Sequence, residues 1–339
     1  MKKFLSSLII IFASFTLYAQ SDSARFYFSK GKEEQNARKF AMAAKSYDKA
    51  IQFDPNYIDA YIENGKVSLE MRRIDPAQGY FTKAITLQPE NPVAIKELAS
   101  LYFNNRQFQK AIDLALKCKA CPESNRIIAM SYFNLEDYGK AIPGLQRELQ
   151  RNPKDAEATY TLGRSFVEQQ DYKNSIVYYQ KAIILDSSRG SWMYELGLLY
   201  YNATDDNNAM KYFLMAGNNG YPQSNDFKEN LGFVYLNTGD IENGMKTLEG
   251  VLSKRPNDKD LLGGVAQAMY KAKKYQEALT YYQKLLELNP QDASSLYMAG
   301  ITFQRMNQKE KGQAMCDQAI KLDPSLAKNR QKKGESMGL

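Results

Sequence analysis

The feature that most constrains this chain is an internal repeat with a period of about 34 residues. A pattern of small, aromatic, small and proline residues occurs twice near the N-terminus with the same spacing, as Ala43, Tyr47, Ala50 and Pro55 and again as Ala77, Phe81, Ala84 and Pro89. The same frame places a small residue at one position nine times, at Gly31, Gly65, Ala99, Ala129, Gly163, Gly197, Gly232, Ala266 and Gly300. A second small position follows in each repeat, at Ala43, Ala77, Ala111, Ala141, Ser175, Ala209, Gly244, Ala278 and Gly312. A chain with such a period folds as a row of similar units that stack on their neighbours.

Each repeat predicts a helical hairpin. An apolar stretch of helical periodicity is followed by a break, such as residues 236–240, and by a second periodic stretch. Small side chains at the facing positions let the two helices approach closely, and large ones such as Tyr47 and Phe213 fill the space beside them. Prolines then end the second helix or open the next hairpin, at Pro55, Pro89, Pro153, Pro256, Pro290 and Pro324.

This pattern resembles the tetratricopeptide repeat (TPR) family, over nearly everything from about Ala24 to Pro324. The resemblance implies an all-α fold, a right-handed superhelical solenoid of about nine TPR-like helical hairpins with a concave groove lined by the first helices. The array then covers residues 20–324 and is irregular at 118–125, where residues are lost, and at 217–222, where residues are inserted. We expect residues 325–339, which are rich in lysine and arginine, to form a C-terminal capping helix or tail.

The first nineteen residues have the pattern of a secretory signal peptide. Lys2 and Lys3 precede a mostly apolar run from Phe4 to Leu17, which is too short to span a bilayer comfortably. We expect cleavage after Ala19, which leaves no integral membrane span and places an exported bacterial TPR protein in the periplasm or at the envelope. Because Leu17 is larger than the residue preferred three positions before a cut, an uncleaved anchor is the alternative.

Composition argues against catalysis and against nucleic-acid binding. The chain has no histidine, which removes the common catalytic triads, the HExxH zinc site and the usual general base near neutral pH. Its net charge is only +7, and its charged residues are interspersed rather than clustered. We therefore expect no enzyme activity, no cofactor, no bound metal and no nucleic-acid partner.

The three cysteines pose separate questions. Cys316 occupies the large position of the last second helix, so we expect a buried thiol. Cys118 and Cys121 form a CxxC pair at the shortened repeat junction. Simple packing, which we favour, a structural disulfide and a redox or metal site all stay open, although a lone CxxC is a weak metal signal.

Candidate binding residues lie at first-helix positions that face the groove in TPR proteins. They are aromatic residues and asparagines that suit an extended peptide, namely Phe103, Asn104, Phe133, Asn134, Tyr160, Tyr194, Tyr201, Asn202, Phe233, Asn237, Tyr270 and Tyr297. The aromatic residues in repeats five to nine are expected to line one wall of the groove. The alternatives are that the aromatic residues pack between hairpins and that the asparagines adopt the left-handed conformation at helix ends.

These observations favour a non-enzymatic scaffold of the cell envelope that holds a partner protein or peptide in its groove. Some TPR grooves grip a C-terminal carboxylate with lysine and asparagine at set positions. Here Lys96 matches such a position, but Ser100 and Ile127 do not, which speaks against that class of partner. The alternative function is capture of a cell-wall or other polysaccharide ligand on the aromatic groove.

Overall fold

The computed structural model describes residues 22–118, 121 and 124–328. Over these residues the chain forms nine helical hairpins, and the predicted all-α solenoid of about nine hairpins is confirmed. Helix 22–36 pairs with α2 (Phe40–Phe53), and α3 (Ile58–Glu70) pairs with α4 (Ile74–Leu87). The other pairs are α5 (Pro92–Asn104) with α6 (Phe108–Ala115), α7 (Ser124–Asn134) with α8 (Tyr138–Arg151), α9 (Ala156–Glu168) with α10 (Tyr172–Leu185), α11 (Gly190–Asn202) with α12 (Asp206–Asn218), α13 (Asn225–Asn237) with α14 (Ile241–Lys254), α15 (Lys259–Lys271) with α16 (Tyr275–Leu288), and α17 (Ala293–Arg305) with α18 (Lys309–Leu322).

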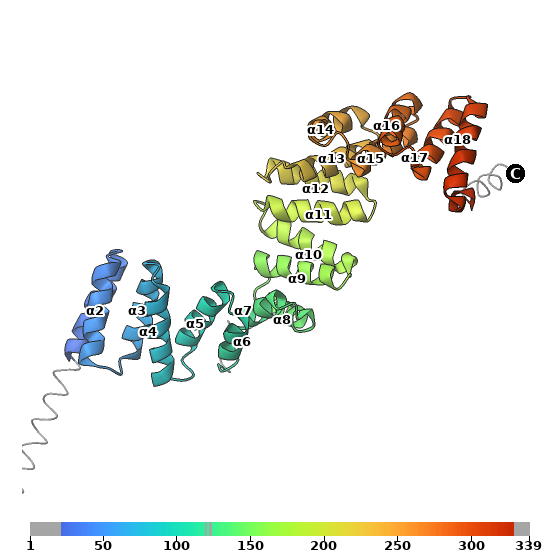
Figure 1. The fold of residues 1–339 in the computed structure, drawn as a ribbon. Helices are drawn as coiled ribbons and strands as arrows, with labels where there is room; N and C mark the ends of the chain where they lie inside the picture. The colour runs from blue at the N-terminus through green and yellow to red at the C-terminus, as the bar shows by residue number, and fades with distance from the viewer. Residues whose placement is uncertain (1–21, 119–120, 122–123, 329–339) are drawn as a thin grey trace, which may run out of the picture. The chain divides into compact units, whose positions relative to one another are not determined.

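The hairpins fall into two compact units, unit 1 up to Ala182 and unit 2 from Ile183. Within each unit, successive hairpins stack side by side (Figure 1). A second helix packs on the first helix of the next hairpin, as α4 does on α5 and α16 on α17. First helices also contact one another, as α5 does α7 and α13 does α15. The core therefore lies between hairpins as much as within them, which is why such an array needs several repeats.

At the first small position, glycines such as Gly65 and Gly197 lie against large rings of the second helix, as predicted. A Cβ atom added at Gly65 would lie 2.6 Å from the Phe81 ring, and one added at Gly197 would lie 2.6 Å from the Phe213 ring. Both rings are fully buried. Since the ring takes the space that a side chain would need, the glycine sets how closely the two helices of the hairpin pack.

The turn inside each hairpin has one recurring feature. A residue with positive φ follows the first helix in every hairpin, at Arg38, Arg72, Arg106, Glu136, Gln170, Thr204, Gly239, Lys273 and Asn307. Only Gly239 and Asn307 are residue types that favour this conformation. The asparagines that were candidates for it, such as Asn104 and Asn134, lie two positions earlier, so that interpretation of them is wrong.

The shortened junction between the third and fourth hairpins contains a disulfide. Helix α6 has 8 residues, whereas α4 and α8 have 14 each. Cys118 and Cys121 are bonded with their Cα atoms 5.4 Å apart, and both are buried in the cluster that contains Phe81 and Leu98. Simple packing of free thiols, the interpretation favoured from the sequence, is therefore wrong, because the chain turns there and brings the two residues together. Cys316 is a buried thiol outside the disulfide, as predicted.

The ends of the array are only partly described. After α18 a short helix η1 (Pro324–Leu326) follows, and Leu326 packs against Leu296, Tyr297 and Cys316. The rest of the expected capping helix and the whole signal peptide lie outside the described residues. Among the described helices, none is long and apolar enough to cross a membrane.

Candidate protein-binding surface

A candidate binding surface is the side of the first helices that does not face the second helix or the preceding hairpin. Positions are counted from residues 24, 58, 92, 122, 156, 190, 225, 259 and 293, which occupy the same place in each repeat. Position eight packs on the second helix of the same hairpin, as Gly65 does on Phe81. Position ten packs on the preceding hairpin, as Val67 does on Ala43 and Tyr47. Positions five and nine lie one turn apart on the remaining side, which we call the first-helix face.

In unit 1, a row of cations follows the first-helix face. Each of the five hairpins contributes one lysine or arginine at position five or nine, namely Lys32, Lys66, Lys96, Arg126 and Arg164. The same two positions hold no acidic residue in unit 1, whereas in unit 2 they hold Glu229 and no cation. This row was not predicted from the sequence, because the candidate residues were chosen among aromatic residues and amides, although the fixed repeat frame is enough to find it.

Arg164 links two of the predicted aromatic residues. Its guanidinium lies 5.2 Å from the ring centroid of Phe133 on α7 and 6.0 Å from that of Tyr160 on α9. Each ring also packs edge-on against its own hairpin, Phe133 on Tyr138 at 5.9 Å and Tyr160 on Tyr179 at 5.4 Å. The two rings and the cation are half-buried, an arrangement that favours a cation–π contact.

Two other cations of the row have carboxylate partners. Lys66 pairs with Glu63 at 3.0 Å, and Arg126 pairs with Asp155 at 2.5 Å. Asp155 also caps α9 by accepting a hydrogen bond from the Ala158 backbone N–H. Burial pushes the pKa of Asp155 upward, but the hydrogen bonds from Arg126 and the backbone outweigh it, and the pKa lies below its usual value. The pair therefore stays charged and holds Arg126 at the face.

In unit 2, the predicted aromatic residues mainly hold hairpins together. The Tyr194 ring stacks on Tyr221 at 4.4 Å and lies 5.7 Å from Phe227, and its hydroxyl accepts a hydrogen bond of 2.8 Å from Asn230. The Phe233 ring covers Gly264 of the next first helix so closely that an added Cβ would lie 2.6 Å from it. Both residues thus join the sixth, seventh and eighth hairpins.

The remaining predicted aromatic residues differ in their surroundings. Tyr297 is buried, and the ring centroids of Tyr270 and Tyr275 lie 5.6 Å apart. Burial and the nearby carboxylates of Asp206 and Glu229 raise the pKa of Tyr201. Phe103 packs on Phe108 at 5.5 Å.

Of the asparagines, Asn134 donates to the Met130 carbonyl and Asn237 to Asp206. Asn104 and Asn202 are exposed. A role in binding stays a prediction for all of them.

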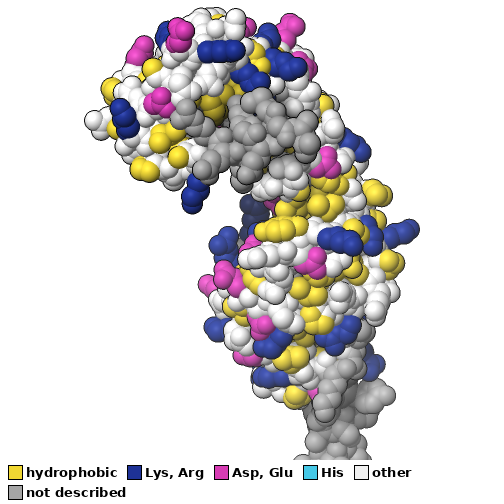
Figure 2. Space-filling view, turned by 90° about the vertical axis from the view of Figure 1, so that its right-hand side faces the viewer, with side chains coloured by type: hydrophobic (Ala, Val, Ile, Leu, Met, Phe, Trp, Pro, Cys, Tyr) yellow, Lys and Arg dark blue, Asp and Glu magenta, His cyan; other side chains and the backbone are white. Residues whose placement is uncertain are grey.

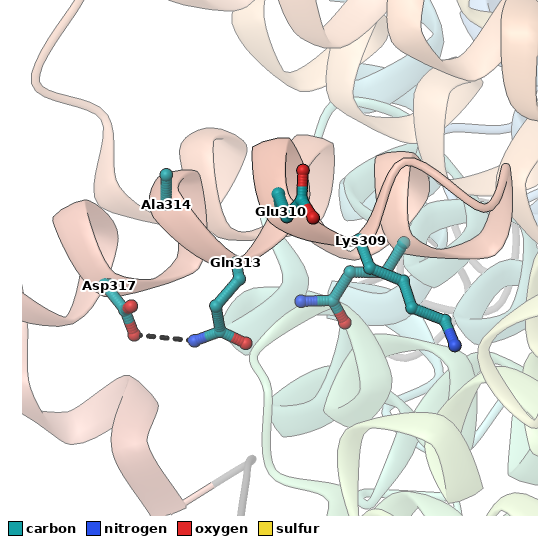
Figure 3. Close-up of a pocket in the computed structure, with 6 residues that line it drawn as sticks. Lys309, Glu310, Gln313, Ala314 and Asp317 are labelled. Atoms are coloured by element: carbon teal, nitrogen blue, oxygen red, sulfur yellow. Dashed lines mark hydrogen bonds between the residues drawn. The ribbon is translucent and has the colours of Figure 1, made fainter.

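Several hollows are lined by second helices, alone or together with first helices. One, of about 690 Å³, is lined by residues of α18 and by Gln304, and Figure 3 shows Gln313 and Asp317 turned toward one another there. Figure 2 shows charged side chains of both signs scattered among hydrophobic ones over one face. The part of the chain that the structure describes has no cluster of three or more side chains suited to a metal ion.

Comparison with known families decides what kind of protein this is. Models of the tetratricopeptide repeat match residues 24–57, 128–191, 160–222, 260–292 and 293–326, which together exceed half of the chain. The chain belongs to the tetratricopeptide repeat family. Its TPR repeats indicate a protein–protein interaction scaffold.

The chain is similar to curated proteins at low sequence identity. The protein CTR9 homolog of Arabidopsis thaliana is 25% identical over 87% of this chain, and the DnaJ protein P58IPK homolog B of Oryza sativa subsp. japonica is 23% identical over 51%. The matches span only 28% and 40% of those proteins.

Among solved structures, YrrB, described as a TPR protein with an unusual peptide-binding site, is 23% identical, with a TM-score of 0.44 over 56% of this chain and 97% of that one. The C-terminal part of a TPR protein from Cytophaga hutchinsonii is 19% identical, with a TM-score of 0.47 over 67% and 94%.

Proposed function

We propose that this TPR chain holds an extended segment of a partner protein on the first-helix face, mainly in unit 1. The observation that carries the proposal is the row of five cations, one in each hairpin of unit 1. A row with one charge per repeat suits a partner that runs along the stack, because each hairpin presents one cation at position five or nine.

The chemistry of the row favours a partner segment that carries carboxylates. Charged hydrogen bonds from lysine and arginine to carboxylates are stronger than neutral ones. Rings beside the cations, such as Phe133 and Tyr160 next to Arg164, add apolar area at low entropic cost. The acidic partners of Lys66 and Arg126 hold these cations in place, and the two side chains stay 33% and 37% exposed.

We also propose that the chain works in the periplasm or at the cell envelope, after cleavage behind Ala19. The basic start and the short apolar run of residues 1–19 support this location. The intact mass of the protein from an exported fraction tests it. A mass that starts at Gln20 is expected, and the full-length mass in a membrane fraction would contradict it.

The binding surface is tested by reversing charges on matched helices. Partners are first captured by crosslinking on the mature chain in intact cells. Lys32→Glu with Lys96→Glu on the first-helix face should weaken capture about tenfold or more, since each change replaces attraction by repulsion. Lys45→Glu with Lys83→Glu on α2 and α4 changes the net charge equally and should leave capture intact. Equal loss in both variants, or competition by cell-wall polysaccharide, would overturn the proposal.

A further inference from the structure

The first hairpin differs from all later ones at position three of its first helix. In hairpins two to nine that residue is buried, whether it is small or large, as at Ala60, Ala94, Ser124, Ala158, Trp192, Phe227, Leu261 and Ser295. In the first hairpin it is Phe26, and 64% of its surface is exposed. A position that serves elsewhere as an internal contact therefore carries a large exposed aromatic residue at the end of the array.

Position three belongs to a row that faces the preceding hairpin. In the second hairpin the row continues as Asn64, Val67 and Met71. The Asn64 amide donates hydrogen bonds to the Asp48 carboxylate at 2.7 Å and to the Ala44 carbonyl at 3.4 Å, and the other two pack against Ala43 and Tyr47. All of these contacts are with α2 of the preceding hairpin. The equivalent residues of the first hairpin are Phe26, Lys30, Glu33 and Ala37, which we call the end-face row.

The end-face row is apolar at one end and charged in the middle. The Phe26 ring lies edge-on to Tyr27 at 5.3 Å, and Tyr27 in turn stacks on Phe53 of α2 at 5.6 Å. Lys30 and Glu33 are exposed and lie one turn apart. An exposed aromatic patch with a polar edge is typical of a surface that another protein covers.

This inference rests on the cleavage behind Ala19 proposed above, which would leave Gln20 and Ser21 before the helix, and two residues reach about 7 Å at most. On that proposal, the pattern of the end-face row indicates which partner covers Phe26.

We propose that the end-face row pairs with the same row of a second copy of this chain, related by a two-fold axis between Lys30 and Glu33. With the two first helices antiparallel, Lys30 of each copy lies opposite Glu33 of the other, and Phe26 lies opposite the small Ala37. A two-fold contact needs a self-complementary surface. In this row the large ring of Phe26 faces a small side chain, and each positive charge faces a negative one.

The opposite end of the array favours a closed pair over a growing filament. There Leu326 already packs on Leu296, Tyr297 and Cys316. On α18, Gln313 donates a hydrogen bond of 2.8 Å to Asp317, and Figure 3 shows both side chains at the hollow on this helix. Within the described residues this end offers no exposed ring to receive Phe26 of another copy, so head-to-head contact is favoured.

Sedimentation equilibrium of the mature chain over about 1 to 100 µM tests the pairing. Twice the mass of one chain is expected at the upper concentrations. Phe26→Asp should raise the dissociation constant about tenfold or more, with an unchanged unfolding transition, because the ring is exposed in the single chain. Tyr172→Asp, at an aromatic residue that is 52% exposed on α10, is the matched control and should pair normally.

Charge reversal tests the register of the pair. Lys30→Glu and Glu33→Lys should each weaken self-association, because like charges then face one another. An equimolar mixture of the two variants should restore it, since every facing pair is again opposite in sign. A single-chain mass at about 100 µM, equal loss in the Tyr172→Asp control, or a mixture that stays unpaired would overturn the proposal. None of these outcomes depends on the partner proposed for the first-helix face.

Discussion

Units 1 and 2 are built from the same hairpin, yet their first-helix faces use side chains differently. In unit 1, one cation per hairpin follows the face, and the rings of Phe133 and Tyr160 flank Arg164. In unit 2, Tyr194 and Phe233 lie against neighbouring hairpins. The comparison teaches that an aromatic residue at a first-helix position is ambiguous by itself. Tyr194 packs on the large Phe227 and Phe233 packs over Gly264, so the role of each ring is set by the neighbours that it meets in the fold.

The largest effect is expected from truncating the packed rings of unit 2. Tyr194→Ala with Phe233→Ala should cost about 4 kcal/mol of unfolding free energy, because each change removes a ring from a contact between hairpins. Phe133→Ala with Tyr160→Ala in unit 1 should cost about half of that. Denaturant titrations of both variants measure the difference. Equal losses would show that the rings pack alike in the two units.

Overpacking the glycine positions should show that each unit unfolds on its own. Gly65→Leu in unit 1 and Gly197→Leu in unit 2 should each cost about 3 kcal/mol, because the new side chain meets the Phe81 or Phe213 ring. Broadened or two-step unfolding is expected, with protection from hydrogen exchange lost in the altered unit. Gly79→Leu is the control, since an added Cβ there meets nothing within 4 Å. Uniform loss across both units would contradict local coupling.

The disulfide should matter less than the packing around it. Cys121→Ser removes a bond between residues 3 apart in sequence, and so short a loop constrains little chain entropy. We expect a loss of about 2 kcal/mol at most, confined to unit 1. Thermal unfolding with and without a reductant measures it. Complete unfolding of the chain on reduction would show that the shortened junction depends on the bond.

The smallest effects are expected at the turns, where the units also differ. All five turns of unit 1 place a residue other than glycine at positive φ, whereas one of the four turns of unit 2 has Gly239. Arg72→Gly should stabilise unit 1 by about 0.5 kcal/mol, and Gly239→Ala should destabilise unit 2 by about 1 kcal/mol. Urea midpoints of the two variants should shift in opposite directions. A shift in the same direction would mean that the exposed Arg72 side chain makes a contact that outweighs its backbone strain.

The sequence predicted the hairpins because their geometry depends on local spacing. Gly65 opposite Phe81 is visible as a repeat, and so is the position of each proline. The roles of the aromatic residues were not predictable in this way. The contact of Tyr194 with Tyr221 depends on the irregular insertion before α13, where no repeat frame applies. The disulfide was likewise hidden, because the shortened junction could have kept Cys118 and Cys121 apart.

The most direct test measures partner capture and unfolding together on two double variants. If unit 1 binds and the rings of unit 2 pack, Lys32→Glu with Lys96→Glu loses capture and keeps its unfolding transition. Tyr194→Ala with Phe233→Ala then unfolds earlier, but its folded fraction still captures the partner. The opposite pattern, with capture lost in the ring variant and kept in the charge variant, would contradict this division of roles.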